Sequence, residues 1–223
     1  MPTEKKLTGY PSIDKPWLKY YPLELLSARP SFDKVLDRIK MVWQNPDETI
    51  INYYDTAIKA GEFFERIEQV AKSLVAMGVK KGDAIVASLE CVPEYIELLF
   101  ACEIIGCCIK NIIEDIDSIV SLINQDETIS LYIAHDYIKH ADAEQIHNNT
   151  NVKNIVVVNP LFSFDKNIEL RSNIAEVIES KYQGDISDNS NNISWTDFLD
   201  RGKEIDFFEQ NQEVPADSFE RDI

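Results

Sequence analysis

Three histidines are the first candidates for metal ligands in this 223-residue chain: His135, His140 and His147. His140 and His147 stand seven residues apart, so on a helix both side chains would lie on one face. A zinc site needs three or four ligands, and neither residue has a His or Cys four positions further along. We therefore interpret this pair as solvated side chains and predict no metal-binding residue.

The four cysteines, Cys91, Cys102, Cys107 and Cys108, all lie in or beside apolar segments, and none belongs to a C-x-x-C pair. Four cysteines in 223 residues are too few for a disulfide-rich scaffold. Adjacent residues of a strand point to opposite faces, which makes a shared redox role for Cys107 and Cys108 strained. We interpret the cysteines as reduced and mostly buried. A catalytic Cys–His arrangement stays open, although no local motif supports one.

Three acidic residues, Glu114, Asp115 and Asp117, follow the second predicted strand of a sheet. Parallel sheets bind their ligands at the edge where strands end, so a cation site is one interpretation. The other is that these carboxylates begin a helix and interact with its dipole. We favour the second interpretation.

Phosphate-binding loops need closely spaced glycines, because backbone N–H groups must approach the anion. Of the seven glycines, only Gly78 and Gly82 are close together, and they flank a helix-to-strand turn. The first predicted strand-to-helix connection, 90–93, contains no glycine. The sequence thus lacks both the dinucleotide fingerprint and the nucleoside-triphosphate P-loop. We predict no catalytic and no cofactor-binding residue in this chain.

Alternating strands and helices would position these residues. Apolar periodicity and capping signals predict the following elements: helices over 31–43, 61–77, 93–105, 116–124, 136–148, 169–182 and 195–199; strands over 84–89, 107–113, 129–134 and 155–158; and a hairpin over 49–59. Such alternation with short connections is typical of a parallel sheet with helices on both faces. We therefore predict an α/β fold with about four or more parallel strands.

The ends of the chain differ from this central part in composition. Residues 1–30 are irregular and rich in Pro and aromatic side chains, which indicates an extended N-terminal arm. Residues 31–200 would form the α/β unit. Residues 201–223 are acidic, and we interpret them as a connector.

The formal net charge of −17, with Lys and Arg scattered, argues against nucleic-acid and anionic-membrane partners. The most apolar stretch, Tyr95–Ile113, contains Glu97, Glu103 and Lys110, so no membrane span is predicted. No apolar run follows the charges of Met1–Leu7, so we predict no secretory signal and a cytoplasmic protein.

Several segments together resemble the opening of the adenylate-forming superfamily, which includes acyl-CoA synthetases, luciferases and peptide-synthetase adenylation domains. The resemblance is strong over residues 8–112 and weaker to about 160. Its leader is similar to that of long-chain fatty-acid–CoA ligases. The segments that carry it are Thr8–Leu18, Ile51–Tyr54, Ile58–Phe64, Val70–Asp83, Pro93–Tyr95 and Ile104–Gly106.

The resemblance implies a two-step reaction, in which a carboxylic acid and ATP give acyl-AMP and the CoA thiol then displaces AMP. It also implies that ATP, Mg²⁺ and CoA are cofactors of a longer parent, whose glycine-rich loop and acidic motifs lie downstream of this chain. We thus expect an inactive N-terminal part of an acid–CoA ligase, truncated before the ATP-binding part. Its partner would be the rest of its own polypeptide, and an exposed apolar face could favour self-association.

Two alternatives remain open. One is a free-standing interaction module of the same fold without ATP chemistry, and the other is an adenylation domain that loads a carrier protein. This chain also differs from the adenylate-forming superfamily in one loop. Members of that superfamily usually have a proline-containing loop after the second strand, whereas residues 111–115 of this chain contain no proline.

Overall fold

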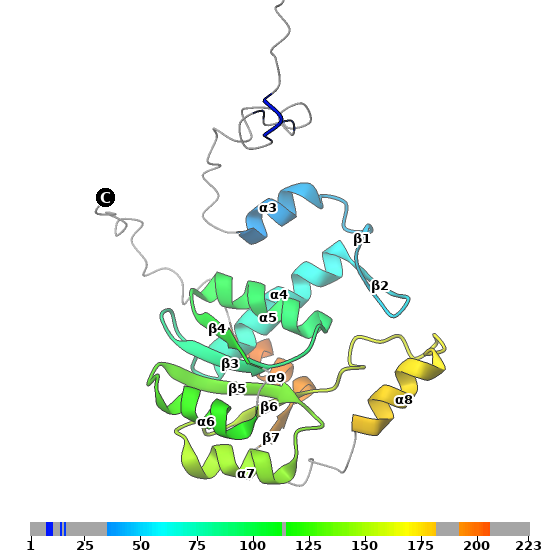
Figure 1. The fold of residues 1–223 in the computed structure, drawn as a ribbon. Coiled ribbons are helices and arrows are strands. Elements are labelled where there is room, and N and C mark those ends of the chain that lie inside the picture. Colours follow the sequence, from blue (N-terminus) through cyan, green and yellow to red (C-terminus); the bar gives the residue numbers. More distant parts are fainter. Residues whose placement is uncertain are drawn as a thin grey trace, which may run out of the picture.

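A computed structural model describes residues 8–10, 14, 16, 35–112, 115–181 and 192–205 of the chain. Five parallel strands form the central sheet in the order β4-β3-β5-β6-β7 (Figure 1). The strands are β3 Ala84–Ser88, β4 Cys108–Asn111, β5 Ile129–His135, β6 Ile155–Val158 and β7 Asn192–Ser194. The predicted α/β class with four or more parallel strands is confirmed.

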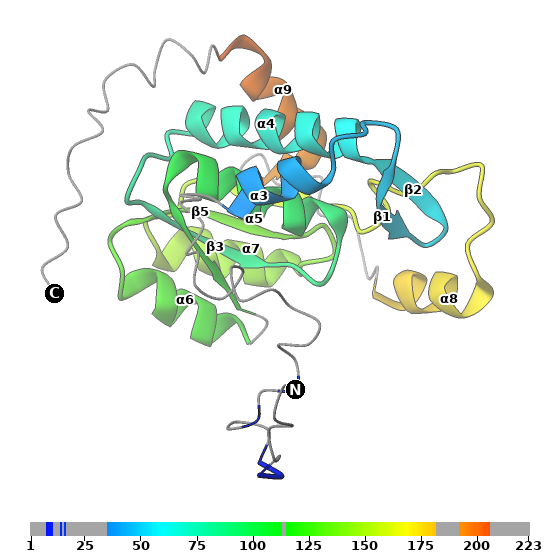
Figure 2. The same ribbon diagram turned by 90° about the horizontal axis from the view of Figure 1, so that it is seen from above.

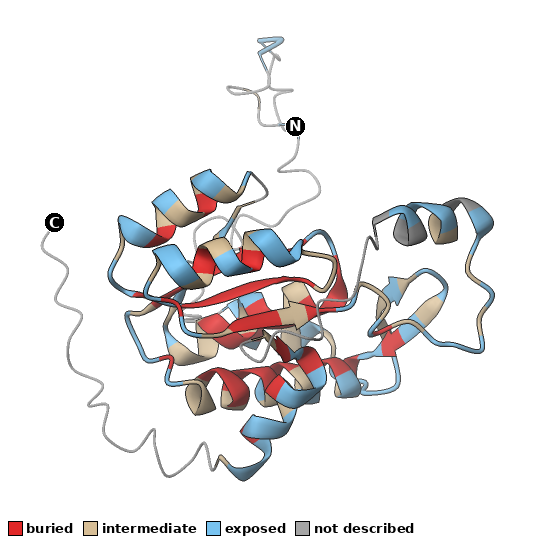
Figure 3. Ribbon diagram, turned by 90° about the horizontal axis from the view of Figure 1, so that it is seen from below, coloured by how far each residue is buried: buried red, intermediate tan, exposed pale blue. Residues whose placement is uncertain are grey.

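Helices cover both faces of this sheet (Figures 1 and 2). On one face lie α4 Ala60–Ala76, α5 Pro93–Ile105 and α9 Trp195–Arg201, and on the other lie α6 Ile116–Asn124 and α7 His140–Asn149. Two further helices, α3 Val35–Val42 and α8 Ser172–Lys181, lie outside these layers. Figure 3 shows buried residues concentrated on the strands and on the inner faces of the covering helices.

Side-chain alternation within the strands explains the two separate cores. In β3, Ile85 and Ala87 pack with α4, α5 and α9, whereas Ala84 and Val86 pack with α6 and α7. All four residues are at most 2% exposed, because helices cover the strand on both sides.

A two-stranded antiparallel hairpin, β1 Thr49–Tyr53 and β2 Thr56–Lys59, precedes α4. Its turn residues Tyr54 and Asp55 have φ of 48° and 67°, as a two-residue hairpin turn requires. The predicted hairpin over 49–59 is confirmed, but its turn lies at Tyr54–Asp55 and not at Asp55–Thr56, where the Asp–Thr pair suggested it. It matters for the site because it contacts the loop that follows β6.

Glycines end the two helices that border the site, as predicted. Gly78, which follows α4, has φ 90°, and the N–H of Val79 donates a hydrogen bond to Leu74 O at 3.0 Å. Gly106 has φ 79° after α5 and donates to Cys102 O at 2.8 Å. Both helices therefore have well-defined C-terminal ends.

Other element boundaries differ from the predictions. β7 was not predicted, because its three residues follow a run of Asp, Asn and Ser that is typical of a loop. α7 begins at His140 rather than Asp136, because Asp136 N–H donates to Val158 O at 3.0 Å and continues the strand pairing. The predicted arm and connector lie largely outside the described residues.

The C-terminal part of the fold approaches α4 closely at Gly202, in the 3₁₀ turn η2 Gly202–Glu204. A Cβ atom at this position would lie 2.5 Å from Ser73 Oγ and 2.6 Å from Ser73 N. We expect Gly202→Ala to lower the free energy of unfolding by about 1–3 kcal/mol. The added methyl group would overlap the backbone of Ser73, which cannot move away without distorting α4. Urea unfolding followed by circular dichroism measures this change. Lys203→Ala, at an exposed neighbour, is the control and should cost no more than about 0.5 kcal/mol.

Candidate functional site at the carboxyl edge of the sheet

The strand order places a topological switch point between β3 and β5. The chain leaves β3 toward β4 on one side, whereas the later strands β5, β6 and β7 extend to the other. Loops that leave neighbouring strands in opposite directions open a crevice at the carboxyl ends of the strands, where α/β proteins bind their ligands. In this chain the crevice lies beyond Ser88 and His135.

A cavity of about 280 Å³ lies at this switch point. Its walls come from the ends of β3 and β5 and from α6 and α7. It is lined by Ser88, Glu90, Ile116, Ile119, Tyr132, Ala134, His135, Tyr137, Ile138 and Asp142. Two of these side chains are carboxyls and none is Lys or Arg.

His135 joins the ends of three strands at this cavity. Its Nε2 accepts the backbone N–H of Glu90 at 2.8 Å, and its Nδ1 lies 3.4 Å from Val158 O. Because Nε2 accepts a hydrogen bond, the assigned tautomer carries its proton on Nδ1 and the ring is neutral. Tyr137 stacks on the imidazole with ring centroids 4.8 Å apart. In this arrangement His135 positions the strand ends.

Tyr132 lies in the same cavity wall and is 2% exposed. Burial raises the pKa of its phenol to about 12, and the carboxylate of Asp142 acts in the same direction. The hydroxyl is therefore protonated at neutral pH and can donate a hydrogen bond.

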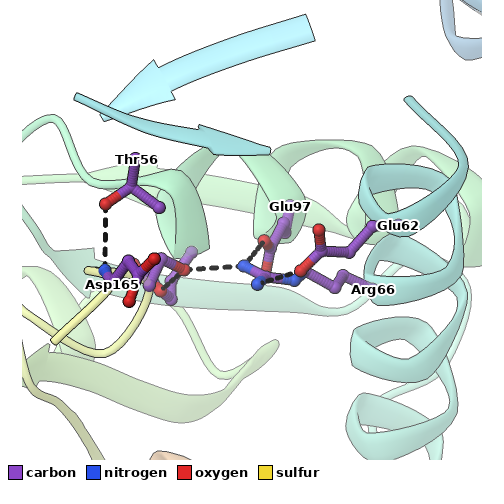
Figure 4. A network of polar contacts seen from close by, with 7 residues as sticks. Thr56, Glu62, Arg66, Glu97 and Asp165 are labelled. Carbon is purple, nitrogen blue, oxygen red and sulfur yellow. Dashed lines mark hydrogen bonds and ion pairs between the residues drawn. The ribbon is translucent and has the colours of Figure 1, made fainter. Parts of the chain in front are cut away.

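An ionic network with two buried carboxyl groups joins α4, the N-terminal part of α5 and the loop after β6 (Figure 4). Arg66 of α4 donates from Nη1 to Ser163 Oγ at 2.7 Å and to Glu97 Oε1 at 3.4 Å, and from Nη2 to Glu62 Oε1 at 2.5 Å. Ser163 in turn donates to Glu94 Oε1. Glu94 is 0% exposed and Glu97 is 2% exposed. The guanidinium of Arg66 is therefore the counterion of two buried carboxyl groups.

The protonation of this network follows from burial. Burial raises the pKa of Glu97 to about 7, the carboxylate of Glu94 raises it further, and Arg66 opposes both. Burial likewise raises the pKa of Glu94, although the hydrogen bond from Ser163 counteracts it. Burial thus favours the protonated form of both carboxyl groups, and Arg66 favours the ionised form.

The network also fixes the loop that follows β6. Tyr53 of the hairpin donates to Pro160 O at 2.8 Å. Thr56 Oγ1 accepts the backbone N–H of Asp165 at 2.9 Å (Figure 4). Together with the contact between Ser163 and Arg66, these bonds attach the loop to α4, α5 and the hairpin.

Comparison with known proteins establishes the family. The model of a family described as AMP-binding enzyme matches residues 40–191. The chain belongs to this family. No curated protein matches the sequence.

Solved structures share the fold of this chain. The R395G mutant of coronafacic acid ligase from Pectobacterium brasiliense superposes with a TM-score of 0.53 at 19% identity, over 74% of this chain and 28% of that one. Unmutated coronafacic acid ligase from the same organism gives 0.52 at 17% identity, with the same coverage. The chain thus spans about 28% of the length of these ligases.

The cavity at the carboxyl edge of the sheet does not fit a triphosphate. The cavity lining offers carboxyl groups where phosphates need cations or clustered N–H donors. Within 35–112, 115–181 and 192–205, no three His, Cys, Asp or Glu side chains gather as they would around a metal ion.

The residues singled out in the sequence occupy different parts of the fold. Asp115 caps α6 and accepts the Ser118 N–H at 3.1 Å, as the helix-dipole interpretation requires, whereas Glu114 lies outside the described residues. His140 lies 3.6 Å from Glu144 on α7, away from the cavity lining. His147 is not simply solvated, because its Nε2 is buried without a hydrogen-bond partner.

The interpretation of the cysteines as mostly buried is wrong for two of them. Cys91 is exposed because it lies in the connection after β3, and Cys108 is exposed because β4 is an edge strand. Cys102 is buried and Cys107 is half-buried. None of the four lines the cavity.

No helix among the described residues is both long and apolar enough to cross a bilayer. The longest described helix, α4, carries charged residues along its outer face.

Proposed function

We propose that this chain is the N-terminal part of an AMP-forming acid–CoA ligase, which activates a carboxylic acid with ATP and passes the acyl group to CoA. The family match over residues 40–191 carries the proposal. It is supported by the shared fold with a protein named a ligase, of which this chain spans 28%. In this proposal the parent is cytoplasmic and uses ATP, Mg²⁺ and CoA.

The chemistry would take place at groups outside this chain. A carboxylate oxygen attacks the α-phosphorus of ATP, pyrophosphate leaves, and the CoA thiol then displaces AMP from the acyl carbon. Such transfers depend on cations that stabilise the charge on phosphorus. The described residues would contribute the five-stranded sheet and its fixed carboxyl edge as a support for that site.

Activity of the isolated chain tests the assignment of its role. We expect no acid-dependent release of pyrophosphate when the chain is mixed with ATP, Mg²⁺, CoA and a panel of carboxylic acids. A full-length acid–CoA ligase is the positive control in the same coupled assay. Turnover by the isolated chain above the enzyme-free blank contradicts the proposal.

The gene beyond codon 223 separates the parent ligase from a free-standing interaction module. The ligase requires a continuation into a Ser/Thr/Gly-rich loop that ends in Lys. A stop codon directly after Ile223 would instead favour a module without ATP chemistry. An acceptor assay on the full-length protein, with CoA and with a carrier protein, distinguishes the two ligase classes.

A further inference from the structure

Two cysteines meet where α5 ends. Gly106 turns the chain back at φ 79°, and the N–H groups of Gly106 and Cys107 both donate to Cys102 O, at 2.8 and 3.1 Å. Cys107 therefore folds over the last turn of α5. Its side chain packs against the core cluster that contains Cys102, as expected where the residue after an αL glycine contacts the last turn of the helix.

The environments of the two thiols differ in the way that a nucleophile and a resolving cysteine require. The neighbouring thiol of Cys102 lowers the pKa of the Cys107 thiol, although burial and the carboxylate of Asp83 oppose this. The proximity of Cys107, together with burial, raises the pKa of Cys102. Cys107 is half-buried, whereas Cys102 is 2% exposed and belongs to the core. Cys107 is thus the thiol that ionises and is reached first.

We propose that Cys102 and Cys107 form a reversible intramolecular disulfide by exchange with a small disulfide such as glutathione disulfide. The Cys107 thiolate attacks one glutathione sulfur, and the first glutathione leaves as its thiolate. Cys102 then gives up its proton and attacks Cys107 Sγ, which releases the second glutathione. The two cysteines lose two electrons, and one glutathione disulfide becomes two thiols.

The other two cysteines are poorer partners. Cys91 follows the carboxyl end of β3, whereas Cys107 precedes the amino end of the neighbouring parallel strand β4, so the two lie at opposite edges of the sheet. Cys108 is the first residue of β4, where neighbouring side chains alternate between faces. The fold therefore selects the pair Cys102–Cys107.

Peptide mapping under native conditions tests the proposal. The chain is equilibrated with glutathione redox buffers, free thiols are alkylated at low pH, and the protein is cleaved after glutamate. Cleavage after Glu103 separates Cys102 from Cys107 and Cys108, so a disulfide joins two peptides. We expect the joined peptides in the wild type and in the Cys91→Ser/Cys108→Ser variant, and their loss in Cys107→Ser.

The folded chain should also favour this disulfide over the unfolded chain. We expect its equilibrium constant with glutathione to be at least about tenfold larger in buffer than in urea, which corresponds to about 30 mV. Circular dichroism confirms that the variants are folded. The proposal is overturned if Cys107→Ser keeps the joined peptides, if Cys91→Ser/Cys108→Ser loses them, or if the two constants are equal.

Discussion

Arg66→Met is expected to lower the free energy of unfolding at pH 8 by about 2–4 kcal/mol. The guanidinium faces the buried carboxyls of Glu97 and Glu94, and it is hydrogen-bonded to Ser163 as well. Methionine fills a similar volume without charge, so Glu97, which is 2% exposed, would lose its counterion and would have to keep its proton at pH 8. Glu97 and Ser163 would also lose a hydrogen-bond donor. The attachment of the loop after β6 to α4 would weaken at the same time.

Urea unfolding, monitored by circular dichroism and tryptophan fluorescence, measures this loss. Arg171→Met is the matched control, because Arg171 is 3.7 Å from Asp55 in an ion pair whose two side chains are exposed. Exposed pairs contribute at most about 1 kcal/mol. If Arg66→Met costs no more than this control, the network does not stabilise the fold.

A double variant separates the charge effect from packing. In Arg66→Met/Glu97→Gln the buried carboxylate is removed together with its partner, so most of the lost stability should return. The cost of Arg66→Met alone should also shrink at pH 5, because Glu97 then takes a proton in both proteins. A cost that is the same at pH 5 and pH 8 would assign it to packing.

Helix and strand positions followed from local signals wherever a capping residue marked the boundary. Pro93 and Gly106 define both ends of α5, and its predicted span of 93–105 is confirmed. β7 could not be found in this way, because its three residues form a strand only through pairing with β6. The order of the strands, and so the place of the switch point, also depends on packing between segments far apart in the chain.

The two buried carboxyl groups of the ionic network could have been inferred from the composition of α5, although the sequence analysis did not infer them. α5 is apolar on all sides rather than amphipathic, which indicates a helix covered on both faces. Glu94 and Glu97 lie inside that helix, so burial of both carboxyls could be inferred from the helix alone. Their partners could not, because Arg66 and Ser163 come from a different helix and from a loop distant in sequence.

The pH dependence of stability provides the second large effect. The pKa of Glu97 is about 7 in the folded chain against an ordinary value of 4.5, so the folded state holds this proton more tightly than the unfolded state. Below pH 4.5 the carboxyl is protonated in both states, and the full stability is present. As the pH rises toward 7, the unfolded chain ionises first, so the free energy of unfolding falls until Glu97 is ionised in both states.

The difference between the two pKa values corresponds to about 3 kcal/mol of stability lost between pH 4.5 and about pH 7 to 8. Glu97→Gln should remove this loss, because an amide does not titrate and can still accept a hydrogen bond from Arg66. We expect the variant to exceed the wild type in unfolding free energy progressively from pH 5 to pH 8, as measured by urea unfolding at each pH. Glu94 remains in both proteins and Glu62 remains paired with Arg66, so the difference isolates Glu97. Parallel pH profiles for the two proteins would mean that Glu97 ionises at an ordinary pH, and that water reaches the interior of the network.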